Sequence, residues 1–236
     1  MPNNDYDRYN FSFRNTTNFL NNKFILDTSA NYIIQNDKNM VSQGQYFNPL
    51  TSLYLFPRGE DFSDVAVYER YDDLSGVNTQ YWPYGDLGGV SSQNPYWIMN
   101  RMNRENDRRR YKLAASLQYN IIEGLNVQGR VSIDNTESKY TEKFHAGTVG
   151  NFAGPKGRYK EENRLDRQVY ADVLANFNKT FNEFNVTANL GASIKDLRME
   201  LTSLHGDLNN VTNHFTIENL TRSGYYKVNA DGLKRQ

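Results

Sequence analysis

The stretch YKLAASLQYNIIEGLNVQGRVSIDN, Tyr111 to Asn135, alternates between apolar and polar side chains in each of its two halves. In the first half, one side carries Tyr111, Leu113, Ala115, Leu117 and Tyr119. In the second half, the matching side carries Leu125, Val127, Gly129, Val131 and Ile133. Two runs of period-2 alternation joined by a short polar break predict a β-hairpin. The open question is whether a protein core or another solvent lies against the apolar side.

The same alternation occurs twice more along the chain. It predicts hairpins over about residues 9–35, 108–138 and 164–204, which makes six antiparallel strands. The predicted strands run roughly 10 to 20 residues, whereas strands in soluble sheets usually have about 5 or 6. Helical periodicity is not seen over a comparable length, so the sequence predicts an all-β fold.

The connections alternate between short and long. Short breaks fall near residues 20–23, 121–124 and 179–183, and long segments cover about 36–107, 141–163 and 205–236. Short turns at one end and long loops at the other are typical of an outer-membrane up-and-down β-barrel. The alternative is a soluble β-sandwich, in which the same alternation faces inward. Strand length, loop asymmetry and the Tyr-flanked apolar stripe from Tyr111 to Tyr119 favour the barrel.

Composition is compatible with a protein that meets two solvents. The 236 residues carry no net charge and include 17 Tyr, 13 Phe and 31 Asn, and the mean hydropathy is −0.79. A neutral chain gives no electrostatic reason to expect a nucleic-acid partner. There is no Cys, no apolar run near the ~20 residues of a spanning helix, and no leader-like start. We therefore expect either a protein that is not exported or an internal piece of a longer one.

The barrel interpretation assigns a role to the polar side of the strands. In a membrane barrel, side chains alternate between lipid and a wet lumen. The side chains predicted to face the lumen are Lys112, Ser116, Gln118, Asn126, Gln128, Arg130 and Ser132.

Aromatic residues are concentrated in the long segment 36–107. Such amphipathic rings can stack on sugars or anchor a partner protein, and they can equally pack the loop against itself. The candidates for contact with a substrate or a covering partner are Phe47, Tyr54, Phe56, Arg58, Tyr81, Trp82, Tyr84, Tyr96 and Trp97.

The sequence gives no sign of catalysis. His145, His205 and His214 have no histidine partner at metal-ligand spacing, and no nucleophile elbow or phosphate-binding loop is present. The carboxylates of residues 68–74 lack a paired site on an opposed element. We expect neither an enzyme nor a cofactor or metal site.

Four strings closely resemble one transporter family. They are GQYFNPLTSLYLFPRGEDF (Gly44 to Phe62), NPYWIMNRMNREN (Asn94 to Asn106), and the stretches Asn18 to Met40 and His205 to Leu220. Together they resemble the SusC/RagA-type TonB-dependent transporters of the Bacteroidetes outer membrane.

The resemblance implies a fold, a function and partners. The family's fold is a 22-stranded barrel with a plugged lumen, embedded in outer-membrane lipid. Members of the family import oligosaccharides or peptides, are driven by TonB, and work with a SusD-like surface lipoprotein. Signal sequence, plug, TonB box and final barrel strand are not recognisable here, so the resemblance implies an internal barrel section whose contact with TonB lies in other parts. The alternative function is a soluble or surface β-sandwich domain that binds carbohydrate or serves in adhesion.

Overall fold

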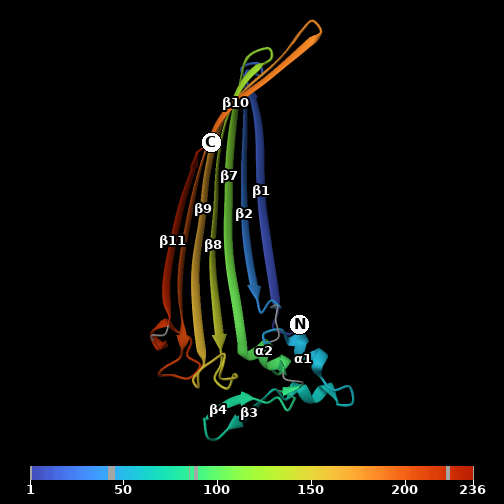
Figure 1. The fold of residues 1–236 in the computed structure, drawn as a ribbon, viewed down its shortest axis with the longest axis vertical. Helices are drawn as coiled ribbons and strands as arrows, with labels where there is room; N and C mark the ends of the chain where they lie inside the picture. The colour runs from blue at the N-terminus through green and yellow to red at the C-terminus, as the bar shows by residue number, and fades with distance from the viewer. Residues whose placement is uncertain (1, 42–45, 85, 88–89, 222–223, 236) are drawn as a thin grey trace.

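The main element of the protein is one antiparallel sheet of seven long strands (Figure 1). The computed structural model describes residues 2–41, 46–84, 86–87, 90–221 and 224–235. Each strand pairs with the next long strand along the chain, so the sheet runs up and down like a section of barrel wall. The strands, in sheet order, are β1 (Asp5–Phe19), β2 (Phe24–Lys38), β7 (Met102–Ile122), β8 (Leu125–Phe144), β9 (Arg158–Phe181), β10 (Phe184–Asp207) and β11 (Tyr225–Arg235).

The three hairpin turns are built from residues that accept a positive φ. Asn21 and Asn22 have φ of 53° and 62° between β1 and β2, and Asn182 has φ of 50° between β9 and β10. Gly124 closes the β7–β8 turn with φ of 84°, and a Cβ placed there would collide with the backbone carbonyl oxygen of Asn178. Glycine is therefore required at position 124 both for its conformation and for the close approach of β9.

The strands extend further toward the long loops than their hydrophobic pattern suggests. β7 begins at Met102 rather than near 108, β8 ends at Phe144, and β9 begins at Arg158 rather than near 164. In these extensions both sides are polar, as the run Arg108–Arg110 illustrates. Without an apolar side there is no alternation from which to predict the strand.

β11 lies in the segment 205–236, for which the sequence predicted only a loop. It pairs with β10 from Leu204 opposite Tyr225 to Ile194 opposite Arg235. Its sequence, YYKVNADGLKR, alternates between apolar and polar side chains only over residues 226–231, a run that the sequence prediction overlooked and that the pairing with β10 identifies as a strand. The described sheet thus has seven long strands where the sequence predicted six.

The long connections gather at one end of the sheet, which we call the loop end, and the hairpin turns lie at the other, the turn end (Figure 1). The connection from β2 to β7 holds most of the loop-end structure. Its elements are α1 (Pro49–Leu55), η1 (Phe62–Ala66), β3 (Glu69–Asp72), β4 (Val77–Gln80), β5 (Asp86–Leu87), β6 (Val90–Ser91) and α2 (Pro95–Arg101). A further turn, η2 (Ile217–Asn219), precedes β11.

Both helices begin at an Asn-Pro pair. The Asn48 side chain accepts a hydrogen bond from the Leu50 amide at 3.0 Å, and the Asn94 side chain accepts one from the Tyr96 amide at 2.8 Å. An Asn cap followed by Pro in the first turn is a strong start signal, because Asn satisfies a free amide and Pro has a preset φ. These caps fix where the loop-end helices begin.

The buried hydrophobic side chains of the described residues all lie at the loop end. They are Val65, Trp97, Ile98, Met99, Met102, Phe144, Ala146, Ala153, Tyr159 and Leu208. No second sheet packs against the long strands, since the other described sheets are the small hairpins β3–β4 and β5–β6. The contacts that a β-sandwich requires are thus missing from the part of the chain that the structure describes.

Candidate functional site

Strand register places all seven predicted lumen-facing side chains on one face of the sheet, the polar face. Ser116 lies opposite Arg130, and Gln118 lies opposite Gln128. Side chains of one strand alternate between faces, and directly paired residues share a face. The same rule places the others on that face, and the full set is Lys112, Ser116, Gln118, Asn126, Gln128, Arg130 and Ser132.

Cross-strand ion pairs cover the polar face. They are Arg14–Asp27, Arg110–Asp134 and Arg130–Asp172, with N–O distances of 2.9, 2.8 and 2.9 Å. Asp172 is 8% exposed and is held by a half-exposed Arg130. Ionised pairs of this kind need water or further polar partners around them, so this face is suited to an aqueous surface.

Two rows of aromatic rings border the opposite face, which we call the apolar face. At the turn end, Phe24 stacks on Phe19 and Tyr119, with ring centroids 5.5 and 4.6 Å apart. Nearer the loop end, a second row is formed by Phe11, Tyr32 and Tyr111, which lie opposite one another. The rows cross the same three strands, and the eight steps from Tyr111 to Tyr119 span ~26 Å along β7.

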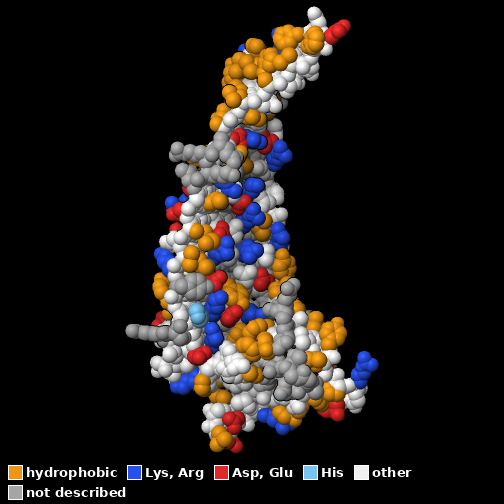
Figure 2. All heavy atoms as spheres, viewed as in Figure 1, with side chains coloured by type: hydrophobic (Ala, Val, Ile, Leu, Met, Phe, Trp, Pro, Cys, Tyr) orange, Lys and Arg blue, Asp and Glu red, His pale blue; other side chains and the backbone are white. Residues whose placement is uncertain are grey.

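The apolar face has no protein covering it. Phe13 is 63% exposed and Leu190 is 78% exposed, and Leu113, Leu117 and Val131 are also exposed. Strands tilted by ~40° would place the two aromatic rows about 20 Å apart in depth, close to the ~25 Å apolar band of a membrane barrel. The view in Figure 2 shows acidic and basic side chains mixed along the middle of the sheet and hydrophobic ones over the projecting β9–β10 tip.

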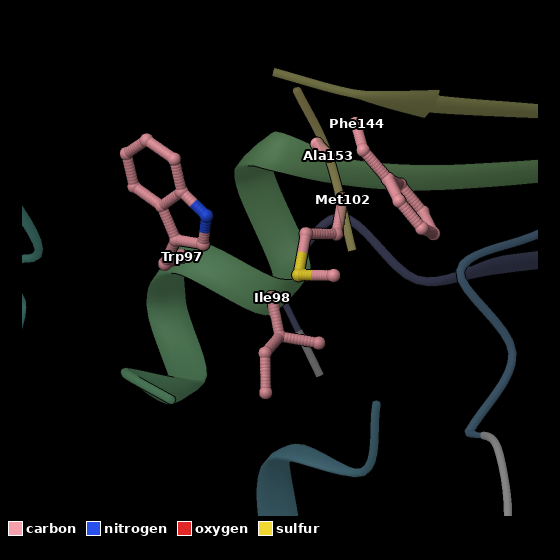
Figure 3. Close-up of a cluster of buried hydrophobic side chains, with 5 residues drawn as sticks. All are labelled: Trp97, Ile98, Met102, Phe144 and Ala153. Carbon is pink, nitrogen blue, oxygen red and sulfur yellow. The ribbon is translucent and has the colours of Figure 1, made fainter. Parts of the chain in front are cut away.

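The loop end is held together by a compact apolar cluster, the mouth core. Its members are Trp97, Ile98, Met102, Phe144 and Ala153. Figure 3 shows Met102 lying between Ile98 of α2 and Phe144 of β8. Trp97 is fully buried, and its indole Nε1 donates a hydrogen bond to Thr148 Oγ1 at 3.1 Å. The mouth core therefore joins α2 to the loop that follows β8.

Most of the aromatic candidates for ligand contact have ring partners within the loop end. Phe47 packs on the mouth core and lies 5.8 Å from the Phe144 ring. Tyr84 contacts the rings of Phe56 and Trp82 at 5.1 and 5.3 Å. Trp82 Nε1 also donates to Ser92 Oγ at 2.8 Å. These side chains shape the loop end through their contacts with each other.

The remaining candidates differ in exposure. The Arg70 guanidinium lies 3.3 Å above the Tyr81 ring, and Tyr96 lies 6.5 Å from the Tyr68 ring. Tyr54 on α1 is 85% exposed, and Arg58 beyond that helix is exposed as well. Of the predicted set, Tyr54 and Arg58 are the side chains most available to an outside partner.

His145 lies at the end of β8, between the mouth core and the last long loop. Its ring is 5.0 Å from the Phe215 ring, and its amide donates to the Arg101 carbonyl at 2.9 Å. Burial of the ring, together with repulsion from Arg101, lowers the pKa of His145 to about 4, although Glu69 opposes this. The side chain is therefore neutral at pH 7 and serves as part of the packing.

Buried asparagines connect the loop-end segments, and no pattern in the sequence indicates them. Asn39 donates to the carbonyls of Asn3 and Met99 at 2.9 and 3.0 Å and accepts from the Arg104 amide at 2.8 Å. Asn94 donates to the Val65 carbonyl at 2.9 Å in addition to capping α2. A polar residue in a polar loop is predicted to be exposed, and only the folded chain reveals these contacts.

The described residues contain no group of three or more His, Asp or Glu side chains arranged to hold a metal ion. Their helices are all too short or too polar to cross a membrane.

A curved single-layer sheet with one polar face, one apolar face and loops at one end defines a segment of an up-and-down β-barrel. Comparison with solved structures gives the same fold. A chain of the RagAB peptide transporter matches with a TM-score of 0.66 at 12% sequence identity. Chains of the RagAB peptide importer in its closed-closed and open-open states match with TM-scores of 0.63, at 14% and 13% identity.

These matches cover 98% of this chain but only about a quarter of each solved chain. At such low identity they establish the barrel fold alone. No protein-family model and no curated protein sequence matches the chain.

Proposed function

We propose that this chain forms part of the wall and mouth of an outer-membrane nutrient importer of the SusC/RagA type. In this proposal the apolar face meets lipid and the polar face lines an aqueous path for an oligosaccharide or a peptide. The similarity to chains of a peptide transporter and a peptide importer favours transport over catalysis.

One observation carries the proposal. Two aromatic rows lie eight residues apart on one face of three neighbouring strands, and hydrophobic side chains between them are exposed. Large exposed apolar surfaces are rare on soluble proteins, whereas aromatic girdles around an apolar band are the rule in membrane barrels. On the other face, the Arg–Asp pairs suit a wet lumen.

The resemblance in the loop-end strings adds partners to the proposal. A SusD-like surface lipoprotein would cover the loop end, where Tyr54 and Arg58 are exposed. TonB would act through regions of the protein beyond this barrel section, by moving a plug out of the lumen. The seven predicted lumen-facing residues, Lys112 to Ser132, would then contact the passing solute and its water.

Neighbouring alanines on β7 provide a matched test of which face meets water. Ala114 lies on the polar face and Ala115 on the apolar face, and the chain has no cysteine of its own. We expect Ala114→Cys, in the complete protein with any other cysteines replaced, to react with a charged water-soluble maleimide in outer-membrane vesicles. Ala115→Cys should resist that reagent, and a fluorophore placed there before reconstitution should be quenched from the lipid phase.

Equal labelling at the two positions, or the reverse pattern, would rule out the barrel-wall assignment. Because the substitutions are identical and adjacent, a difference between them reflects the face and not the chemistry of the thiol.

A further inference from the structure

Charges on the polar face are not evenly paired. Its carboxylates are occupied: Asp27, Asp134 and Asp172 bind arginines, and Asp37 accepts a hydrogen bond from Asn106 at 2.9 Å. On the same face nearer the loop end, Asp166 is paired with Arg164, Glu162 with Lys160, and Glu142 accepts a hydrogen bond from Tyr140. Within the described residues, most acids of this face are thus paired with a cation, whereas Asp37 and Glu142 accept hydrogen bonds from neutral donors.

Three exposed cations near the loop end of β1 and β7 lie on the same face without such partners. Within the described part of the chain, Arg8, Arg108 and Lys112 form no side-chain hydrogen bond or ion pair, and all three are exposed. Lys112 lies opposite Asp134 and attracts it electrostatically, but the hydrogen bonds of that carboxylate go to Arg110, with an Nε–O distance of 2.8 Å. We call Arg8, Arg108 and Lys112 the cationic row.

The members of the cationic row can reach a common ligand. Arg8 and Arg108 both lie opposite Gln35, from its two sides, so their backbones are about 9.5 Å apart. Lys112 is four residues along β7 from Arg108, about 13 Å away. Side chains of this length converge readily across such distances on an extended ligand that carries several charges.

The position of the cationic row fits an entry site. Lys112 is adjacent to Tyr111 in the aromatic row nearer the loop end, and Arg108 lies between that row and the mouth core at Met102. A solute that passed the loop end would meet these cations before the part of the sheet flanked by lipid. Clustered cations that lack ion-pair partners attract anions and raise their local concentration.

We propose that the cationic row binds acidic oligopeptides, so that the transported solutes include peptides rich in Asp and Glu. Arg binds carboxylates through two parallel hydrogen bonds, and three separated cations suit carboxylates spaced along an extended chain. A sugar acid would also supply carboxylates, but sugar rings favour an aromatic platform. The polar-face neighbours of Arg108, which are Gln35, Asn106, Arg110 and Ser138, include no aromatic ring, and Tyr6 beside Arg8 is the one aromatic side chain of β1 on this face.

This inference rests on the proposed importer function, and its test separates the two. Binding of tetraglutamate and of tetraglutamine would be measured by calorimetry on the complete protein in detergent micelles. We expect Arg108→Gln and Lys112→Gln each to weaken tetraglutamate binding about tenfold, the loss of one charge-assisted hydrogen bond, while tetraglutamine binding is unchanged. High salt should reduce the preference for tetraglutamate.

Arg109→Gln is the matched control, since Arg109 is the next residue of β7 and lies on the other face. Tetraglutamate binding should be the same in Arg109→Gln as in the unaltered protein. An unchanged affinity in Arg108→Gln, or an equal loss in Arg109→Gln, would overturn the cationic row as a binding site. Tetragalacturonate binding as tightly as tetraglutamate would overturn the assignment to peptides.

Failure of the importer proposal has a different signature. If the Ala114→Cys and Ala115→Cys pair labels as expected but tetraglutamate shows no preference over tetraglutamine, only the cationic row is wrong. If the labelling pattern itself fails, the polar face is not a lumen and both proposals fall.

Discussion

The loop end and the seven-stranded sheet are stabilised in different ways. At the loop end, Trp97 is fully buried and sits in a cluster that joins four segments of the chain. In the sheet, Leu190 is 78% exposed, and the buried side chains within the strands between the aromatic rows are polar, such as Asp172. The loop end is packed like a water-soluble protein, whereas the sheet has backbone pairing, polar contacts and ion pairs on one face, and ring stacking but no covering layer on the other.

This difference indicates where each region obtains its stability. Burial of apolar surface is the dominant favourable term in folding, and the mouth core obtains it from contacts within this chain. The apolar face can obtain it only from something outside the described residues, which in the proposed function is lipid. The difference is testable, because the effect of a substitution on stability should depend on packing within the chain at the mouth core and on lipid at the apolar face.

The largest expected effect is at the mouth core. Trp97→Ala should destabilise the loop end by about 3–5 kcal/mol, because truncating a buried Trp loses its contacts and leaves a cavity. It also removes the hydrogen-bond donor to Thr148. Hydrogen exchange of amides in residues 94–102 and 144–153 should become about a hundred to a thousand times faster.

Phe13→Ala on the apolar face is the control for this measurement, because Phe13 is a large ring in the sheet and exposed. It should leave exchange at the loop end unchanged. Protection at residues 94–102 that survived loss of the Trp97 ring would mean that the loop end is not held by the mouth core.

The second effect belongs to the sheet. Ala115→Arg should lower the stability of the protein in lipid vesicles by about 2–4 kcal/mol, because Ala115 is midway between the aromatic rows and an arginine there would lie at the bilayer midplane. Ala114→Arg places the same side chain on the polar face, beside Ser132, and should cost less than about 1 kcal/mol. Urea unfolding of both variants in vesicles of one lipid gives the difference directly. A greater cost at Ala114 than at Ala115 would reverse the assignment of the two faces.

The sheet could be predicted from sequence where its two faces differ. Between Tyr111 and Tyr119 the alternation is complete, and the register of β7 with β2 and β8 follows the predicted faces. Near the loop end the same strands continue through Arg108 and Arg109, where both sides are polar and a period-2 signal cannot exist. β11 was missed for a different reason, since its alternation covers only residues 226–231 and stands alone in a long polar segment.

The candidate site was predictable only in part. The polar-face residues share a face as the alternation requires, but the pairing of Asp134 with Arg110, which leaves Lys112 without a hydrogen bond to that acid, depends on side-chain geometry. In the loops, aromatic composition identified Trp97 and Tyr54 alike, yet the first is buried and the second is 85% exposed. Long-range contacts decide between these outcomes, and a single sequence contains no direct record of them.

The abundance of Asn illustrates the same limit. The sequence suggested that it reflects two solvents, whereas the structure shows specific backbone roles. Among the described residues, seven non-glycine residues have a positive φ. Six of them are Asn, and the exception is Leu20. Others cap helices or bind buried carbonyls, as Asn94 does in both ways. Asn suits these positions because it tolerates the left-handed conformation and carries both a donor and an acceptor.

The smallest effect is a pH dependence confined to the loop end. The pKa of His145 is about 4 in the folded protein against an ordinary 6.5, so between these values the unfolded loop end binds more protons than the folded one. Its stability should therefore be complete above pH 6.5 and fall as the pH drops toward 4. Because part of the ring still meets water, we expect a loss of about 1–2 kcal/mol from this residue, less than the full pKa shift would give.

The measurement is the exchange protection of residues 144–153, corrected for intrinsic rates, at pH 7, 5.5 and 4.5. This protection should decline in the unaltered protein and much less in His145→Leu. The sheet between the aromatic rows should show no matching change, and an equal decline in both proteins would assign the acid sensitivity to other groups.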